Sequence, residues 1–544
     1  MEEPCVNDAR PQVPARSQRP RPGRNRTPRT TVGMTPSTAG RRAGQDGFPQ
    51  ALRAEWARFR SSRGWALAMA ASVLVTVSLG LLIAGGVRST CVTGKGEGPC
   101  PAPLLGPDGT AVKDKYYFVH QPLKGNGAIT ARVSDLTGQM RLPDAVPGVR
   151  NVAEGVVPWA KAGLLVRQSL KQGTPYAAVM LTGEHGVRMQ HNYVHDIPGG
   201  PHNGPQWLRL TRSGDTVSGY ESDDGRTWTE IGTVELAGLP ETVEIGLFAT
   251  SPGVLWSMAK AFAQATATFD QITLQGANGS WRHDDVGVGL ESDGRTPHHP
   301  GGVVESGDKL IVTGGGDIGP ATVEGGMRAD LMLIGGAVGL IPVLAAAVTF
   351  CTTGHRRGRS PGGLPEGPHP ARRPAAQAAV FGALAFVTGL VTSGVVVPAG
   401  LALLRAHQNP IQPITLATGL RVIVGYAALT AAAAVLALGL AALAKRAVVA
   451  IGLSIALVVV PYGLATAGLA PWLLMVTPAA GFAITQSVPT FAHVDVGPSL
   501  LEGYYPLPPW AGLAVTCGYA AVALGAAIAV RRRRAPRERD SRLR

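Results

Sequence analysis

The stretch WALAMAASVLVTVSLGLLIAGGV, residues Trp65–Val87, carries no charged side chain and is long enough to cross a lipid bilayer as one helix. Only 16% of the 544 residues are charged, a fraction well below that of ordinary soluble domains. Such a composition predicts a polytopic α-helical membrane protein with six transmembrane helices and excludes a single soluble globule. The five later runs with the same properties are Leu331–Phe350, Ala375–Leu404, Val422–Ala444, Ala447–Leu469 and Trp510–Val530.

The formal net charge of +14 is concentrated in short segments beside the apolar runs. Residues 1–63, 351–374 and 531–544 are rich in arginine, whereas residues 88–328 are mildly acidic. Because basic residues of membrane proteins stay on the cytoplasmic side, we expect both termini to be cytoplasmic and 88–328 to be extracellular. The expected location is the plasma membrane. Charge placed in this way indicates the lipid bilayer, and not a nucleic acid, as a partner.

The segments before the first apolar run have two distinct compositions. Residues 1–49 are dominated by Pro, Arg, Gly and Thr, which predicts a disordered, basic cytoplasmic tail. In residues 50–63, Leu52, Trp56 and Phe59 recur at helical spacing among arginines, which predicts an amphipathic helix on the inner leaflet. The other predicted boundaries are 64–87 for helix one, 328–530 for helices two to six and 531–544 for a basic cytoplasmic tail.

The segment after the fifth apolar run leaves two interpretations open. Pro471–Ile484 is apolar but too short to span a bilayer, and Pro478 interrupts it. Together with the polar stretch that follows, it forms an external segment at 471–509. A re-entrant hairpin here would need its backbone buried in protein, whereas an interfacial segment would lie on the outer leaflet.

The region 88–327 has the pattern of β-strands. Nine short runs alternate apolar and polar residues between Gly, Asp, Asn and Pro turn signals, which predicts an all-β sandwich between helices one and two. The string ESDDGRTW, Glu221–Trp228, resembles an Asp-box hairpin with Asp223 in place, a structural motif that implies no chemistry. The nine runs are Ala128–Val133, Ala162–Gln168, Tyr176–Leu181, Val187–Asn192, Gln206–Arg212, Thr216–Glu221, Thr229–Val234, Thr242–Phe248 and Ala265–Leu274.

Few residues are candidates for chemistry. Cys91 and Cys100 flank a Gly-rich stretch, and in an oxidising exterior they could form a disulfide. The chain has no G-x-x-x-x-G-K-[ST] loop and no H-E-x-x-H motif, so neither an ATPase site nor a common metalloprotease site is predicted. We therefore expect no catalytic residues, no metal site and no cofactor bound by this chain, which is not predicted to be an enzyme.

Four strings in the polar region carry a likeness to a known fold: WAKAGLLVRQS (Trp159–Ser169), Gln206–Trp228, VEIGLFATS (Val243–Ser251) and ATFDQITL (Ala267–Leu274). Over about 113–275 the region resembles the concanavalin A-like sandwiches of lectins and glucanases. Glucanases of this fold carry an E-x-D-x-x-E arrangement, which is missing here, so hydrolysis is not expected. The resemblance leaves a cell-wall glycan as a possible partner.

The membrane part carries a second likeness, in LRAEWARFRSSRGW (Leu52–Trp65), Leu420–Ala465, Leu473–Pro489 and Pro509–Arg534. It resembles the permeases of ABC type-2 transporters from high-GC Gram-positive bacteria. The first string is similar to the amphipathic elbow helix that opens those permeases. This resemblance implies a transport subunit, with export as the expected direction and an unknown substrate.

The same resemblance implies the partners of the chain. A separate ABC ATPase subunit would use ATP, and a second permease would complete a homodimer or heterodimer. The elbow residues Leu52, Glu55, Trp56 and Phe59 are the expected coupling surface, because the Thr353–Pro374 loop is too rich in Gly and Pro to hold a coupling helix. An alternative function is a membrane-anchored glycan-binding or sensory protein that acts through the sandwich.

Overall fold

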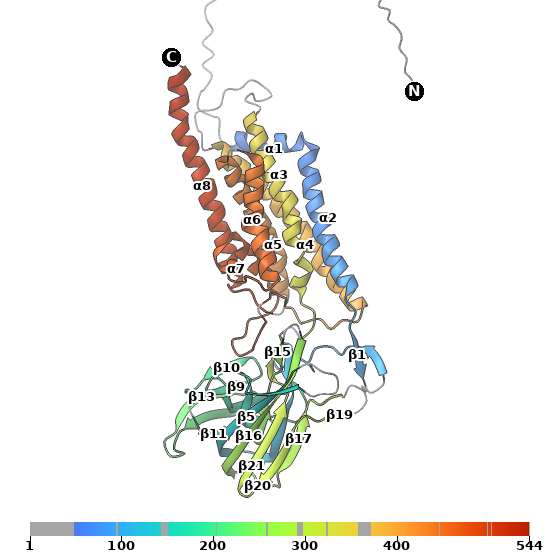
Figure 1. The fold of residues 1–544 in the computed structure, drawn as a ribbon, viewed down its shortest axis with the longest axis vertical. Helices are drawn as coiled ribbons and strands as arrows, with labels where there is room; N and C mark the ends of the chain where they lie inside the picture. The colour runs from blue at the N-terminus through green and yellow to red at the C-terminus, as the bar shows by residue number, and fades with distance from the viewer. Residues whose placement is uncertain are drawn as a thin grey trace, which may run out of the picture. The chain divides into compact units, whose positions relative to one another are not determined.

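The computed structural model describes residues 48–93, 96–142, 151–202, 204–256, 259–290, 297–322, 325–356, 372–444, 446–497, 499–501 and 503–542. Nearly all of the predicted tail at 1–49 and most of the Gly- and Pro-rich loop lie outside the described residues. Along the chain, two helices are followed by a block of strands and then by the remaining helices. Figure 1 shows the helices gathered in one bundle and the strands in one β domain.

The helices of the described residues include six that are long and apolar enough to cross a membrane. Each of these six overlaps one of the predicted apolar runs, so the prediction of six candidate transmembrane helices is confirmed. The helical elements are α1 (Phe48–Arg60), α2 (Arg63–Gly86), η2 (Ala329–Leu333), α3 (Gly336–Arg356), α4 (Arg372–Ala406), α5 (Leu416–Leu443), α6 (Ala447–Thr466), α7 (Leu473–Val476), η3 (Pro478–Thr485) and α8 (Pro509–Arg542), where η marks a 3-10 helix.

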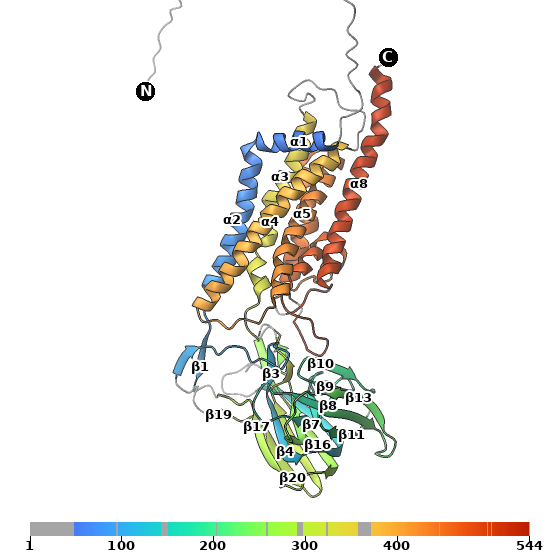
Figure 2. The same cartoon turned by 180° about the vertical axis from the view of Figure 1, so that it is seen from behind.

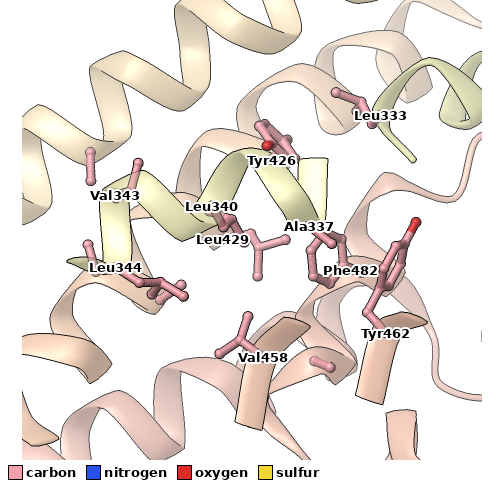
Figure 3. Close-up of a cluster of buried hydrophobic side chains, with 14 of the residues drawn as sticks. Leu333, Ala337, Leu340, Val343, Leu344, Tyr426, Leu429, Val458, Tyr462 and Phe482 are labelled. Carbon is pink, nitrogen blue, oxygen red and sulfur yellow. The ribbon is translucent and has the colours of Figure 1, made fainter. Parts of the chain in front are cut away.

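Helix α5 lies at the centre of the bundle and contacts α3, α4, α6, α8 and η3. In its apolar window 72% of the residues are buried, against 22% in α2 and 28% in both α6 and α8. Close contact with α8 depends on Gly439, since a Cβ atom there would lie 2.7 Å from the Ala523 carbonyl carbon. Figure 3 shows core side chains that converge from several elements, among them Leu333 of η2, Leu340, Val343 and Leu344 of α3, Tyr426 and Leu429 of α5, Val458 and Tyr462 of α6, and Phe482 of η3.

The β domain is built on two antiparallel sheets. The seven-stranded sheet has the order β10 (His195–Pro198), β9 (Val187–His191), β8 (Tyr176–Thr182), β7 (Lys161–Arg167), β14 (Thr242–Thr250), β4 (Tyr116–Lys124) and β17 (Arg282–Val286). The nine-stranded sheet has the order β13 (Thr229–Glu235), β12 (Thr216–Ser222), β11 (Gln206–Ser213), β5 (Gly127–Leu142), β16 (Ala259–Gln275), β21 (Lys309–Gly315) and β20 (Gly302–Ser306), with β6 (Asn151–Glu154) on β5 and β15 (Val254–Trp256) on β16.

Three further strand pairs flank the sheets: β1 (Thr90–Thr93) with β2 (Gly96–Pro99), β3 (Val112–Asp114) with β22 (Ile318–Pro320), and β18 (Gly289–Leu290) with β19 (Pro297–His298). Side chains from both main sheets form one buried cluster, to which Leu164, Leu247, Leu208 and Phe269 belong. The domain is therefore a β-sandwich, as the alternating pattern predicts.

All nine predicted strands are present, but the sandwich does not end near residue 275. Strand β21 pairs with β16, and β20 pairs with β21, so the nine-stranded sheet continues to Gly315. These two strands, of five and seven residues, lie outside the range of about 113–275 over which the sequence resembles a known sandwich. In the Asp-box-like turn, Asp224 and not Asp223 accepts the backbone N–H groups of Arg226 and Thr227, at 2.8 and 2.7 Å.

Two helical segments refine the predicted boundaries. All residues of η3, Pro478–Thr485, are buried, and the segment packs against α5, α6 and α8. Burial in protein is the condition set for a re-entrant segment, and it argues against an interfacial position for this part of 471–509. At the carboxyl end, the predicted tail 531–544 continues α8 as helix up to Arg542.

Candidate functional site

The predicted coupling helix, α1, lies across one end of the bundle, as both Figure 1 and Figure 2 show. It turns Glu55 inward, with only 6% of that residue exposed. The Glu55 carboxylate accepts hydrogen bonds from Arg58 Nη1 at 3.0 Å, from Arg373 Nε at 3.3 Å and from Gln377 Nε2 at 3.3 Å. Since Arg373 and Gln377 belong to α4, this buried carboxylate fastens α1 to α4.

Arg58 extends the same network to α3. Its Nη2 atom donates to the Phe350 carbonyl and, at 2.9 Å, to Thr353 Oγ1. The guanidinium carbon also lies 4.5 Å from the centre of the Phe350 ring, a cation–π contact. Through Glu55 and Arg58 together, α1 is attached to two helices of the bundle.

Aromatic contacts support the same attachment. The Phe59 ring of α1 meets the Phe381 ring of α4 edge-on at 6.5 Å; beside it, the Trp65 ring of α2 meets the Phe350 ring of α3 edge-on at 5.0 Å. Trp56 is 45% exposed. An apolar groove of about 600 Å3 separates α1 from α4; it is lined by Leu52, Arg53, Trp56, Ala379, Val380, Ala383, Leu384 and Val387.

The four predicted coupling residues therefore divide into two groups. Leu52 and Trp56 line an open groove, whereas Phe59 and Glu55 contact α4. Glu55 directs its carboxylate to Arg373 and Gln377 of α4 and is 6% exposed, and its membership of the coupling surface stays a prediction. Leu52, Glu55, Trp56 and Phe59 all follow the i, i+3, i+4, i+7 spacing of one helix face, so the spacing alone did not separate the two groups.

The other end of the bundle holds a buried ionic cluster that sequence reasoning missed. Arg328 Nη2 donates to Asp330 Oδ2 at 2.8 Å, and both side chains are almost fully buried. Arg328 also donates to the Gly503 and Leu500 carbonyls at 2.9 and 2.8 Å, while the Ser487 hydroxyl donates to Asp330. The cluster ties the segment between η3 and α8 to the start of α3.

In the β domain, the structure joins Cys91 and Cys100 in a disulfide. These residues lie in or beside the paired strands β1 and β2, in register at Cys91 and Gly98. Among the described residues, no group of three or more His, Cys, Asp or Glu side chains is arranged to hold a metal ion.

His120 of β4 lies between two carboxylates on the seven-stranded sheet. Its Nδ1 atom is 2.6 Å from Glu244 Oε2, its Nε2 atom is 2.9 Å from Asp284 Oδ2, and the side chain is 1% exposed. Burial of the ring lowers its pKa, but the hydrogen bonds to Glu244 and Asp284 outweigh burial, so the pKa of His120 lies above its usual 6.5. The imidazolium form donates to both carboxylates.

This arrangement predicts that the β domain loses stability as the pH rises. Because the folded-state pKa of His120 exceeds the unfolded one, its stabilising contribution is complete below about pH 6.5 and is lost as the pH passes the folded pKa. We expect the melting temperature of the full chain to fall more between about pH 6 and about pH 9 for the wild type than for His120→Gln. Equal slopes in calorimetry of the two proteins would contradict the assignment.

Comparisons with known proteins leave the family of this chain open. No protein-family model matches the chain, and no curated protein matches it. The GH43 protein BlXynB from Bacillus licheniformis aligns at 16% identity over 28% of this chain and 27% of its own, with a TM-score of 0.19. A functionally unknown protein from Saccharomyces cerevisiae aligns at 14% identity over 30% of this chain and 76% of its own, with a TM-score of 0.18. Scores of this size support no functional argument.

Proposed function

We propose that the chain is the membrane-spanning permease subunit of an ABC transporter and that a separate subunit supplies ATP hydrolysis. The observation that carries this proposal is the set of six long apolar helices, four of which pack against α5, preceded by an amphipathic helix. A protein that only displays a β-sandwich needs one membrane anchor. Five further helices with a common buried core fit a transport path better than an anchor.

The contacts of α1 support a role in transmitting force. Because Glu55 and Arg58 fasten α1 to both α3 and α4, a displacement of α1 would move two helices of the bundle at once. The exposed side of α1 carries Arg53, Trp56 and Arg60. In the proposed complex this basic and aromatic face meets the ATPase, and a second permease completes a homodimer or heterodimer.

The proposal includes a topology with both termini in the cytoplasm and the β-sandwich outside the cell. Arginines beside the helix ends support it. A reporter fused after Arg534 is expected to read cytoplasmic, and one inserted within residues 291–296 is expected to read external. An external carboxyl terminus would contradict the topology.

The function itself is tested by purifying the tagged full chain from its native membrane. A P-loop ATPase should copurify, and its rate of ATP hydrolysis should rise when the chain is added back in lipid nanodiscs. The Trp56→Ala variant is compared with the wild type at equal membrane abundance. Less ATPase should copurify with the variant. If the folded chain purified without any ATPase, the proposal would be overturned.

A further inference from the structure

Residues 486–505, which we call the bridge segment, lie between η3 and α8, and the structure describes 486–497, 499–501 and 503–505 of them. The segment is closed at its base, where Arg421 Nη2 of α5 donates to the Gln486 carbonyl at 2.6 Å and the Tyr505 amide donates to Gln486 Oε1 at 3.0 Å. The buried Arg328 holds two further carbonyls of the segment. The bridge segment is therefore fixed to the helical bundle at both of its ends.

His493 connects the middle of the bridge segment to the β-sandwich. Its side chain is 3% exposed, and its Nε2 atom lies 3.1 Å from the carbonyl oxygen of Tyr193, in the turn between β9 and β10. Because a carbonyl oxygen only accepts, Nε2 must hold the proton of this hydrogen bond. Tyr193 is itself held in place, since its hydroxyl donates to the buried Asp114 at 2.8 Å. The acceptor for His493 therefore lies on a well-anchored turn.

Two aromatic rings pack against the His493 imidazole. The ring centres of Trp159 and Phe491 lie 6.3 and 6.0 Å from its own, and both pairs meet edge-on. Trp159 is 4% exposed and precedes β7, whereas Phe491 belongs to the bridge segment. Among the residues that the structure describes, the bond to Tyr193 is the only hydrogen bond of the imidazole. In the neutral ring, Nδ1 holds a lone pair and no proton.

The charge around the imidazole comes from several elements. Burial lowers the pKa of His493 below its usual 6.5 and the Lys161 ammonium lowers it as well, which together outweigh the hydrogen bond to Tyr193 and the nearby carboxylates. The neutral imidazole is therefore the form that suits this site. The charged or titratable groups around it are Lys161 of β7, Asp196 of β10, Asp317 before β22, His185 and Arg188 against the Trp159 ring, and Asp495 of the bridge segment.

We propose that the bridge segment makes an acid-sensitive contact with the sandwich, which neutral His493 holds and which protonation of this ring releases. Protonation adds one proton from the solvent to Nδ1 and breaks no covalent bond. The new N–H group and the positive charge would lie in a buried aromatic site near the Lys161 ammonium, and both burial and that charge oppose them. The inference does not rest on the proposed transport function, because every contact that it uses lies within this chain.

The contact is expected to weaken as the pH falls below about 6.5. A released His493 has the ordinary pKa of about 6.5, whereas the held one has a lower pKa. The contact is therefore complete above about pH 6.5, loses strength as the pH falls toward the lower pKa, and changes no further below it. One proton allows the equilibrium between the held and released states to change by at most about tenfold per pH unit.

The test is hydrogen–deuterium exchange of the full chain in lipid nanodiscs at about pH 7.5 and about pH 5, corrected for the pH dependence of intrinsic amide exchange. In the wild type, the amides of residues 486–497 and of the β9–β10 turn should lose about threefold or more of their protection at the lower pH. His493→Gln keeps a donor for Tyr193 but does not take up a proton, so its protection should be the same at both pH values. His299→Gln, which removes an imidazole with a side chain that is 61% exposed, is the matched control and should respond like the wild type.

Two further measurements separate release of this contact from general unfolding. Peptides from β4 and β14 should keep their protection at about pH 5, because acid favours the imidazolium form of His120 that stabilises the sandwich. His493→Ala should show low protection of residues 486–497 already at about pH 7.5.

Four results would each overturn the proposal. The wild type could keep its protection at the lower pH, or His493→Gln could lose protection in acid as the wild type does. His493→Ala could be fully protected at about pH 7.5. Finally, β4 and β14 could lose protection together with the β9–β10 turn, which would show unfolding of the whole sandwich.

Discussion

Replacing Asp114 by asparagine is expected to lower the free energy of unfolding of the β-sandwich by about 3–5 kcal/mol. The side chains of Asp114 and Arg167 are completely buried, and Oδ2 and Nη2 are 3.0 Å apart. The same Oδ2 atom accepts from the Tyr193 hydroxyl at 2.8 Å and from the Gly173 amide at 2.9 Å. A neutral amide at position 114 leaves the guanidinium as a buried charge without its counter-ion.

The measurement is the melting temperature of the full chain, followed by tryptophan fluorescence. For a domain of this size the predicted loss corresponds to a fall of roughly 6–20 °C. Asp223→Asn, at an exposed turn position, is the matched control and should stay within about 0.5 kcal/mol of the wild type. Replacing Asp114 and Arg167 together by leucine and methionine should recover part of the loss, because no unpaired charge remains. A fall below about 2 °C for Asp114→Asn would contradict the importance of the pair.

The second large effect is expected for Glu55→Ala, which should weaken the attachment of α1 to α4. The variant loses the three hydrogen bonds that Arg58, Arg373 and Gln377 donate to the Glu55 carboxylate, and it removes the negative charge beside the two arginines. Each hydrogen bond to a charged group contributes about 1.5–3 kcal/mol when buried, and partial exposure of the two arginines reduces this, so we expect a total loss of about 2–3 kcal/mol. Membrane abundance and ATPase stimulation should fall together.

Comparison with Trp56→Ala distinguishes anchoring from partner contact. Trp56 is largely outside the network, so its loss should leave abundance unchanged and weaken only ATPase copurification. Glu55→Gln keeps an acceptor for Gln377 and should lie between Glu55→Ala and the wild type. If Glu55→Ala reached normal abundance and lost only copurification, Glu55 would face the partner, as the sequence alone suggested, and its burial in the structure would be contradicted.

The six candidate membrane helices were predictable from sequence because their length and apolar character depend on local composition. A run such as Trp65–Val87 without a charge must be helical in a bilayer, where every backbone N–H group needs an internal partner. The nine strands were predictable for a similar reason, since alternation along each strand reflects one buried and one exposed face. The ATPase partner, the orientation and the substrate are expectations that rest on charge placement and resemblance, and they stay predictions.

Side-chain partners required the tertiary structure. Glu55 reads as an exposed charge on an amphipathic helix, yet its partners Arg373 and Gln377 stand 318 and 322 positions away. Burial of a carboxylate is tolerated only when hydrogen-bond donors surround it. No local sequence pattern indicates which residues from distant segments will supply those donors.

The same limit applies to the sandwich. Gln121 stands in an ordinary β-strand pattern, yet the packing of the two sheets leaves it 6% exposed, with its Oε1 atom lacking a hydrogen-bond partner among the described residues. Sequence by itself therefore determined which segments become helices and strands, because those choices follow from short-range hydrophobicity and hydrogen bonding. Contacts between segments far apart in the chain decided which polar side chains are buried, paired or left without a partner. These contacts form only when the chain folds, so short-range sequence patterns do not reveal them.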